Sequence, residues 1–243
     1  MKAKKLYIYG KHAVREALIH APQIISTLYL SPQMKDRDIL DLSRHAGVRT
    51  EKIDQTKVSS QVEGGAPHQG AIALVSLGAL TISLEKFLDT YKPEGTCLVY
   101  LDGIQDPHNV GAIVRAAAAF GATAVLLPQQ KQSPITGAVV KASAGAAFSI
   151  PLVTVTNTQA TLSELKRRGV AVYGLAGEAT ESIADEDFNG PTLFVLGNEA
   201  DGVSASARPL CTKLLRIPIS SAVESLNVAS AATAALYAWR TRR

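Results

Sequence analysis

The sequence has few of the residues that build metal centres or disulfide frameworks. It contains two cysteines, Cys97 and Cys211, far apart in apolar stretches, and five scattered histidines. Two distant cysteines in such surroundings are typical of reduced core thiols, and no Cys/His spacing matches a zinc site. We therefore expect two free cysteines and no bound metal.

Long apolar runs and the common nucleotide-binding motifs are also missing. The apolar segment at residues 6–9 is too short for a signal peptide, and no run approaches the ~18 apolar residues of a membrane span. GxGxxG does not follow the first strand-like segment of the second half, and GxxxxGK[ST] and GxSxG are absent. We expect a cytoplasmic protein that is not a dinucleotide-binding or P-loop enzyme.

The charge balance permits a polyanionic partner without requiring one. Lysine and arginine together number 25, against 21 aspartates and glutamates, and the isoelectric point is about 9.0. The excess of basic over acidic residues is concentrated in the terminal stretches MKAKK and WRTRR, where charges are most often simply solvated. A length of 243 residues suffices for one large or two small domains.

Residues 1–76 have the pattern of a small α/β domain. Helical periodicity runs through 11–22 and 34–47, and strand-like segments cover 26–31, 48–53 and 71–77. The stretch 77–95 follows, with a short helix that Ser83 is placed to cap, flanked by glycines and a proline. We assign it to a linker.

From residue 96 onward, strand-like and helix-like segments alternate. This alternation predicts an open, mainly parallel sheet with helices on both faces. Ligands of such sheets bind beyond the carboxyl ends of the strands. The rule directs attention to four loops that follow strands, at residues 102–109, 175–180, 196–202 and 217–227.

The segment DPHNVGAIVRAAAAFGA has one charged side chain after its opening aspartate, namely Arg115. On a helix its larger apolar side chains share one face, and Arg115 lies on the other among glycine and alanine. So many small residues indicate another backbone packed close by, which would hold Arg115 in a tight, partly buried place. A guanidinium there needs an anion, and an internal ion pair and a substrate phosphate are both compatible with the pattern.

The four loops and the Arg115 helix hold only a few side chains able to do chemistry. Ser225 and Asn227 are each placed to cap the final alanine-rich helix, which is the commoner role of such residues. Gly197 and Gly202 flank the remaining candidates of the third loop and most often mark a turn. The candidate polar residues are Asn109, Arg115, Asn198, Glu199, Ser225 and Asn227.

These candidate residues fall within three motifs that resemble those of a known family. NVGAIVRAAAAFGA, LGNEADGV and IPISSAVESLNVASAA resemble, in that order, motifs one, two and three of the SpoU/TrmH RNA 2′-O-ribose methyltransferases of the SPOUT superfamily. YGKHAVREAL and HQGAIALV resemble the small L30e-like RNA-binding domain that precedes the catalytic domain in the ribosomal RNA members. The resemblance covers nearly the whole chain and is greatest to members that methylate a guanosine of bacterial 23S rRNA.

The resemblance implies a deep trefoil knot within residues 96–243, S-adenosylmethionine as the cofactor, and a homodimer. Ordinary rules of chain connection would not have proposed a knot. Main-chain groups at turns would contact the edges of the adenine and aliphatic side chains its faces. By the same likeness, the cofactor would be held by Leu175, Ala176, Gly177, Leu196, Gly197, Ile217, Pro218, Ser225, Leu226 and Asn227.

The resemblance also implies methyl transfer to a ribose 2′-hydroxyl of RNA without a metal. Arg115 corresponds to the essential arginine of the family, and because a guanidinium does not readily lose a proton, we expect it to clamp a phosphate and stabilise the developing alkoxide. Glu199 would orient Arg115 or an amide, while Asn109, Asn227 and Ser225 complete the expected catalytic group. The proton acceptor is not identified.

Two alternatives stay open. The substrate could be transfer RNA, although the N-terminal domain favours ribosomal RNA because many tRNA enzymes of the family lack it. The protein could also be a non-catalytic RNA-binding member of the same fold, which the presence of Arg115, Glu199, Ser225 and Asn227 disfavours.

Overall fold

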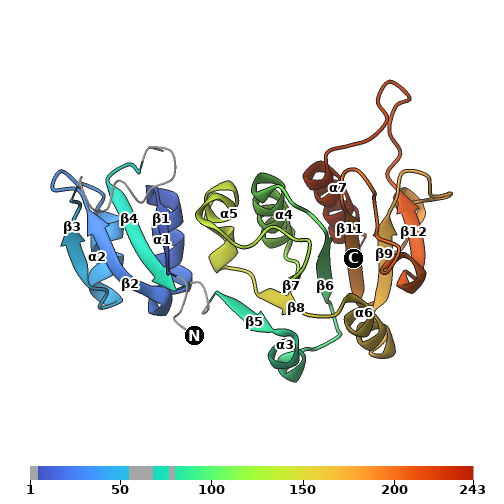
Figure 1. Ribbon diagram of the computed structural model, residues 1–243, viewed down its shortest axis with the longest axis horizontal. Helices are drawn as coiled ribbons and strands as arrows, with labels where there is room; N and C mark the ends of the chain where they lie inside the picture. Colours follow the sequence, from blue (N-terminus) through green and yellow to red (C-terminus); the bar gives the residue numbers. More distant parts are fainter. Residues whose placement is uncertain (1–4, 55–67, 77–79, 243) are drawn as a thin grey trace.

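The computed structural model describes residues 5–54, 68–76 and 80–242, which form two β-sheets, one of four strands and one of eight (Figure 1). The smaller sheet lies at the N-terminal end of the molecule, and the larger sheet runs through the rest. The first residues of the basic stretch MKAKK and residues 77–79 of the predicted linker lie outside the described residues.

The four-stranded sheet has the order β1-β4-β2-β3, with β4 antiparallel to both of its neighbours and β2 parallel to β3. Two helices predicted from periodicity form and pack on each other. The first strand was not predicted, because its burial rises along the chain instead of alternating. The elements are β1 (Lys5–Tyr9), α1 (Lys11–His20), η1 (Pro22–Ile24), β2 (Ile25–Leu30), α2 (Arg37–His45), β3 (Thr50–Lys52) and β4 (Ala71–Ser76).

The eight-stranded sheet has the order β10-β12-β9-β11-β6-β7-β8-β5, and all of its strand pairs are parallel, as predicted. Every residue of β6 is buried, which fits a strand covered on both faces. The strands are β5 (Thr81–Ser83), β6 (Cys97–Asp102), β7 (Ala124–Pro128), β8 (Leu152–Val155), β9 (Ala171–Leu175), β10 (Glu181–Ser182), β11 (Thr192–Gly197) and β12 (Lys213–Arg216).

Helices cover both faces of this sheet, as the alternating pattern predicts. Val99 and Leu101 of β6 belong to the core shared with α4 and α7, whereas Leu98 and Tyr100 belong to the core shared with α3 and α6. The helices are α3 (Leu84–Thr90), α4 (Pro107–Phe120), α5 (Gly137–Ala142), α6 (Thr158–Arg167) and α7 (Val228–Thr241), with short 3-10 turns η5 (Ala146–Phe148), η6 (Ile183–Asp185) and η7 (Arg208–Leu210).

The small-residue side of α4 does pack against another backbone. A Cβ added to Gly111 would lie 2.4 Å from Cβ of Ala142 and 2.7 Å from the carbonyl oxygen of Val139, so α5 can approach this closely only at a glycine. The expectation of a partly buried Arg115 is wrong: the side chain is exposed. It lies one helical turn beyond Gly111, and its long stem carries the guanidinium into solvent.

Residues 80–95 contribute to the larger sheet. β5 pairs with β8 at one edge, and α3 follows at once, with Oγ of Ser83 accepting a hydrogen bond from the N–H of Lys86 at 3.3 Å, the cap that the sequence predicts. The small domain packs on the part of the chain that holds the larger sheet through α5 (Figure 1), where Nζ of Lys141 lies 5.2 Å from the ring centre of Tyr9.

Two further expectations can be compared with the structure. Cys97 and Cys211 are reduced thiols, the first buried and the second half-buried. Within the described residues, no helix combines the length and the apolar character that a membrane crossing needs.

Candidate active site

A cavity of about 560 Å³ opens at the carboxyl ends of β9, β11 and β12, where the strand-end rule predicts a ligand site. Its walls come from the loops after these strands and from the start of α7. The lining residues are Leu175 to Glu178, Leu196 to Val203, Leu215, Ile217, Ile219, Glu224 to Val228 and Ala231.

All residues that the resemblance assigns to cofactor binding line this cavity except Pro218. Ile217 and Ile219, on either side of that proline, both line it. The structure therefore brings together four segments that are separated by up to 50 residues in the sequence, as 175–177 and 225–227 are.

The turn after β11 is held in one conformation by close packing and by hydrogen bonds. A Cβ on Gly197 would lie 2.1 Å from the carbonyl carbon of Gly202, so no other residue fits there. Nδ2 of Asn198 donates to the carbonyl oxygen of Gly103 at 2.8 Å, and Oδ2 of Asp102 accepts from the N–H of Ser204 at 2.7 Å. The turn is thereby fastened to the end of β6 at two points.

Three side chains form a continuous hydrogen-bonded chain at the mouth of the cavity. Nδ2 of Asn109 donates to Oε1 of Glu199 at 2.5 Å, and Nδ2 of Asn227 donates to Oδ1 of Asn109 at 2.9 Å. Oδ1 of Asn227 accepts from the N–H of Ala229, so Asn227 rather than Ser225 caps α7. These hydrogen bonds fix the direction of both amides, and Glu199 and Asn227 line the cavity whereas Asn109 does not.

The local sequence explains why these side chains meet. Asp106 caps α4, with Oδ1 accepting from the N–H of His108 at 2.8 Å, and Pro107 supplies the first residue of the helix. Asn109 therefore lies in the first turn of α4, beside the first turn of α7. Glu199 reaches Asn109 from the turn that Gly197 allows.

Arg115 lies apart from this group. It is exposed, it does not line the cavity, and it makes no hydrogen bond or ion pair within the described residues. It projects from α4, which packs along α7, and Tyr237 of α7 is 59% exposed while its ring lies 6.2 Å from that of Phe120. Each of these two neighbouring helices thus has one exposed side chain of interest, Arg115 on α4 and Tyr237 on α7.

The charged residues that line the cavity are all acidic: Glu178, Glu199, Asp201 and Glu224. Sequence reasoning singled out only Glu199 among them. It also did not include Ile219, which is 41% exposed although it is apolar. An exposed apolar residue two positions after Ile217, in the same loop that follows a strand, is the signal that would have identified it.

The half-buried thiol near the cavity does not offer a nucleophile. Burial and the charge of Asp102 raise the pKa of Cys211, so its thiol stays protonated near neutral pH. Cys211 is not among the lining residues.

Comparison with known proteins places this arrangement in a family. The model of the SpoU rRNA methylase family matches residues 96–237, and that of the RNA 2′-O ribose methyltransferase substrate-binding domain matches residues 7–77. The chain belongs to the SpoU rRNA methylase family, which confirms the resemblance seen in the three motifs.

Individual relatives cover nearly the whole chain. It is 39% identical over 240 residues to the 23S rRNA (guanosine-2′-O-)-methyltransferase RlmB of Ralstonia nicotianae, a match spanning 98% of this chain and 95% of that protein. The AdoMet-bound rRNA methyltransferase of Sinorhizobium meliloti matches 98% of this chain and 87% of its own, with a TM-score of 0.81 and 25% identity. The SpoU methyltransferase AviRb of Streptomyces viridochromogenes, in complex with AdoMet, shares the fold, with a TM-score of 0.83, 23% identity and coverage of 99% and 91%.

Proposed function

We propose that the protein transfers a methyl group from S-adenosylmethionine to the ribose 2′-hydroxyl of a guanosine in 23S rRNA. The observation that carries the proposal is the hydrogen-bonded series Glu199–Asn109–Asn227 beside a strand-end cavity in a member of this family. The relative from Ralstonia nicotianae, named for this reaction, is similar along almost its entire length.

The cavity suits the proposed cofactor. Its volume of about 560 Å³ lies within the range of small-molecule sites, and glycines 177 and 197 leave main-chain groups open to a ligand. Leu196, Ile217 and Leu226 offer aliphatic contacts for the faces of an adenine. The acidic lining favours a ligand that carries a cationic centre, as a sulfonium does. S-adenosylmethionine supplies a methyl group that is already activated for transfer.

The three hydrogen-bonded side chains, Asn109, Glu199 and Asn227, would then align the acceptor ribose. Asn109 and Asn227 have fixed amide directions, so they can hold a ribose hydroxyl and the cofactor in register. Glu199 orients Asn109 and keeps its second oxygen for a substrate hydroxyl. A cation is also needed, because the acidic lining repels an RNA phosphate.

We infer that Arg115 of a second copy supplies that cation. Within the described residues no lysine or arginine lines the cavity, and Arg115 is exposed on the surface of α4 while Tyr237 is exposed on that of α7, the helix packed against it. A homodimer that covers this surface would bring the guanidinium of one subunit to the cavity of the other. There it would clamp the phosphate beside the target and stabilise the developing alkoxide.

The remaining features of the proposal follow from the same likeness. We propose an L30e-like substrate-binding domain at residues 1–76, a linker at 77–95, and a knotted catalytic domain at 96–243; the family matches at 7–77 and 96–237 support these limits. Ribosomal RNA as the substrate would place the protein in the cytoplasm.

The experiment that tests the function is transfer of labelled methyl from S-adenosylmethionine to transcripts of 23S rRNA and of total tRNA, followed by nucleoside analysis. We expect label in 23S rRNA, recovered as 2′-O-methylguanosine. Label in tRNA alone would establish the tRNA alternative. Tight binding of the cofactor with no transfer to either RNA would instead identify a non-catalytic protein.

A further inference from the structure

The small domain contains a cavity of its own, of about 320 Å³, between the start of α1, the loop after β2 and the turn at residues 68–70. Its lining includes two lysines, Lys11 and Lys35, and two side-chain amides, Gln33 and Gln69. We propose that this cavity binds one unpaired nucleotide of the substrate RNA, away from the nucleotide that is methylated. The inference rests on the proposed function for the identity of the RNA.

The charge of this cavity is opposite to that of the methyl-transfer cavity. Both charged residues in its lining are lysines. Lys35 is exposed and makes no ion pair within the described part of the chain. Nζ of Lys11 lies 3.5 Å from Oδ2 of Asp36, but the lysine side chain is still 42% exposed. Two lysines at one cavity favour the binding of a phosphate group.

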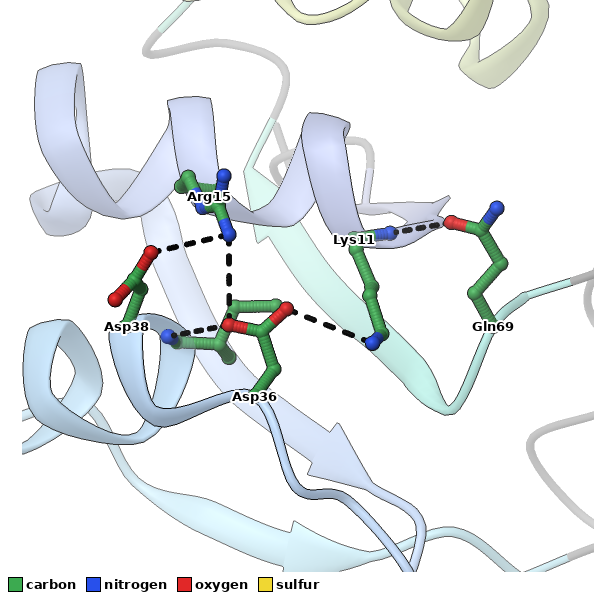
Figure 2. Close-up of polar contacts among 6 residues, drawn as sticks. Lys11, Arg15, Asp36, Asp38 and Gln69 are labelled. Carbon is green, nitrogen blue, oxygen red and sulfur yellow. Dashed lines mark hydrogen bonds and ion pairs between the residues drawn. The ribbon is translucent and has the colours of Figure 1, made fainter.

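The acidic residues behind the cavity are already engaged (Figure 2). Oδ1 of Asp36 accepts from the N–H of Ile39 and lies 3.4 Å from Nη2 of Arg15, which also pairs with Asp38. Burial opposes the ionisation of Asp36, but these partners outweigh it and lower the pKa of its carboxyl. Asp36 therefore stays ionised and positions Lys11 from below, without lining the cavity.

Gln69 has a backbone conformation that is costly for its residue type. Its φ is +52°, in the left-handed region that glycine and asparagine adopt more easily. Its Oε1 accepts from the backbone N–H of Lys11 at 3.1 Å (Figure 2), which fixes the direction of an amide that lines the cavity. The NH₂ group makes no hydrogen bond within the described residues and is free to donate to a ligand.

The turn that carries Gln69 is seated closely on the opposite wall. A Cβ on Gly70 would lie 3.2 Å from Cβ of Ser31 and 3.3 Å from Cε of Met34. The glycine thus lets the turn approach the loop after β2, so that Gln69 and Gln33 line the same cavity. The thioether of Met34 supplies an apolar surface between the polar groups.

This combination fits a nucleotide and not a phosphate alone. Side-chain amides pair with the donor and acceptor edges of bases, and the lysines suit the attached phosphate. In an RNA duplex those edges are held in a stack and a narrow groove, so only an unpaired nucleotide can enter the hollow. A volume of about 320 Å³ is at the small end of ligand sites, which suits one nucleotide.

The experiment measures binding directly, by fluorescence anisotropy of the full chain with single-stranded RNA of about 12 nucleotides. Its matched probes are an abasic strand of equal length and a duplex. Lys35→Glu reverses a charge in the cavity, and Lys5→Glu makes the same change at the far end of β1, where Lys5 is also exposed. Gln33→Ala removes one amide while keeping both lysines.

We expect wild type to prefer the single strand to both other probes. Lys35→Glu should weaken its binding about tenfold, whereas Lys5→Glu should change it less than about twofold. Gln33→Ala should weaken binding of the single strand about threefold and leave the abasic strand unaffected. Equal effects of Lys35→Glu and Lys5→Glu would overturn the site. Equal binding of the abasic strand would reduce it to an anion site and overturn nucleotide recognition.

Methyl transfer is scored separately, so the two proposals can fail independently. Absence of methyl transfer to 23S rRNA, together with the expected losses of RNA binding, would reject the proposed function and still support the nucleotide site. Normal transfer with a KM for RNA that Lys35→Glu leaves unchanged would remove the nucleotide site alone.

Discussion

Asn109 and Glu199 lie 90 positions apart in the sequence, yet the amide of the first donates to the carboxylate of the second at 2.5 Å. This hydrogen bond joins the first turn of α4 to the turn after β11. Asn227 extends it to the first turn of α7. These residues of the proposed methyl-transfer site are therefore one connected group whose members fix each other's direction.

The first prediction concerns this coupling. Because Asn109 and Glu199 act through one hydrogen bond, Asn109→Ala and Glu199→Ala should each lower kcat about tenfold or more, and the double variant should lose little further. Steady-state methyl transfer for the four proteins of the cycle measures the interaction. Losses that multiply fully in the double variant would show that the two residues act independently.

Arg115→Ala should leave the fold and cofactor binding intact while methyl transfer falls about 100-fold. The side chain is exposed on a helix and makes no contact of its own within the described residues, so its removal should change the free energy of unfolding by less than about 0.5 kcal/mol. Arg44→Ala, at another exposed helical arginine, is the matched control. Turnover within a few-fold of wild type would exclude a phosphate clamp at Arg115.

If Arg115 of one subunit completes the site of the other, dimers that mix two variants should regain activity. Arg115→Ala and Glu199→Ala should each have low activity alone, but a mixed dimer contains one cavity with its own Glu199 and the arginine of the other subunit. After the two variants are unfolded and refolded together, activity should return to roughly a quarter of wild type, since half of the dimers are mixed and each has one intact site. Refolded mixtures as inactive as the separate variants would show that Arg115 does not act across subunits.

Asn227→Ala should damage cofactor binding and catalysis together. It removes an amide at the cavity and the cap of α7, where Oδ1 accepts from the N–H of Ala229 at 2.9 Å. Asn157→Ala removes an equivalent cap from α6, outside the cavity, and should cost a similar ~1 kcal/mol of stability without affecting the enzyme. Calorimetric titration of S-adenosylmethionine separates the two effects; unchanged affinity and normal turnover in Asn227→Ala would reject its role.

The decrease in the free energy of unfolding at alkaline pH should depend on Tyr100. Burial, helped by the charge of Asp102, raises the pKa of Tyr100 to about 12 despite its hydrogen bond with Thr158. Below the ordinary tyrosine pKa of 10.0 both states keep the proton, whereas between 10.0 and about 12 only the unfolded chain loses it. The free energy of unfolding should therefore fall as the pH rises through this window.

Tyr100→Phe removes that contribution. It should be about 1 kcal/mol less stable than wild type near neutral pH, because the hydroxyl of Thr158 loses its partner. Its stability should decline less steeply above pH 10.0, so the difference from wild type narrows. Urea unfolding across this range provides the comparison, and parallel curves for the two proteins would contradict the assignment.

Much of the fold could be predicted because the sequence patterns that indicate its strands and helices are local. The strands of the large sheet, such as β6, are continuous apolar runs, and the helices between them carry recognisable caps at Ser83 and Asp106. The position of the cavity follows from the rule that ligands lie beyond the carboxyl ends of parallel strands. β5, β10 and β12 have two to four residues each, too few for a periodicity to be seen.

The side-chain network could not be predicted from local pattern. The hydrogen bonds that tie Asn109 to Glu199 and to Asn227 span 90 and 118 residues, and nothing near any of these residues signals its partner. The choice between Ser225 and Asn227 as the cap of α7 likewise depended on the backbone. The exposure of Arg115 was mispredicted because a face of small residues shows that a neighbour is near without showing where it ends.

The most direct measurement is a map of ribose methylation in 23S rRNA from cells with and without this gene. The account predicts that one guanosine loses its 2′-O-methyl group when the gene is absent and regains it when wild type is restored, but not when Arg115→Ala is supplied. An unchanged methylation map of 23S rRNA in the deleted strain would contradict it.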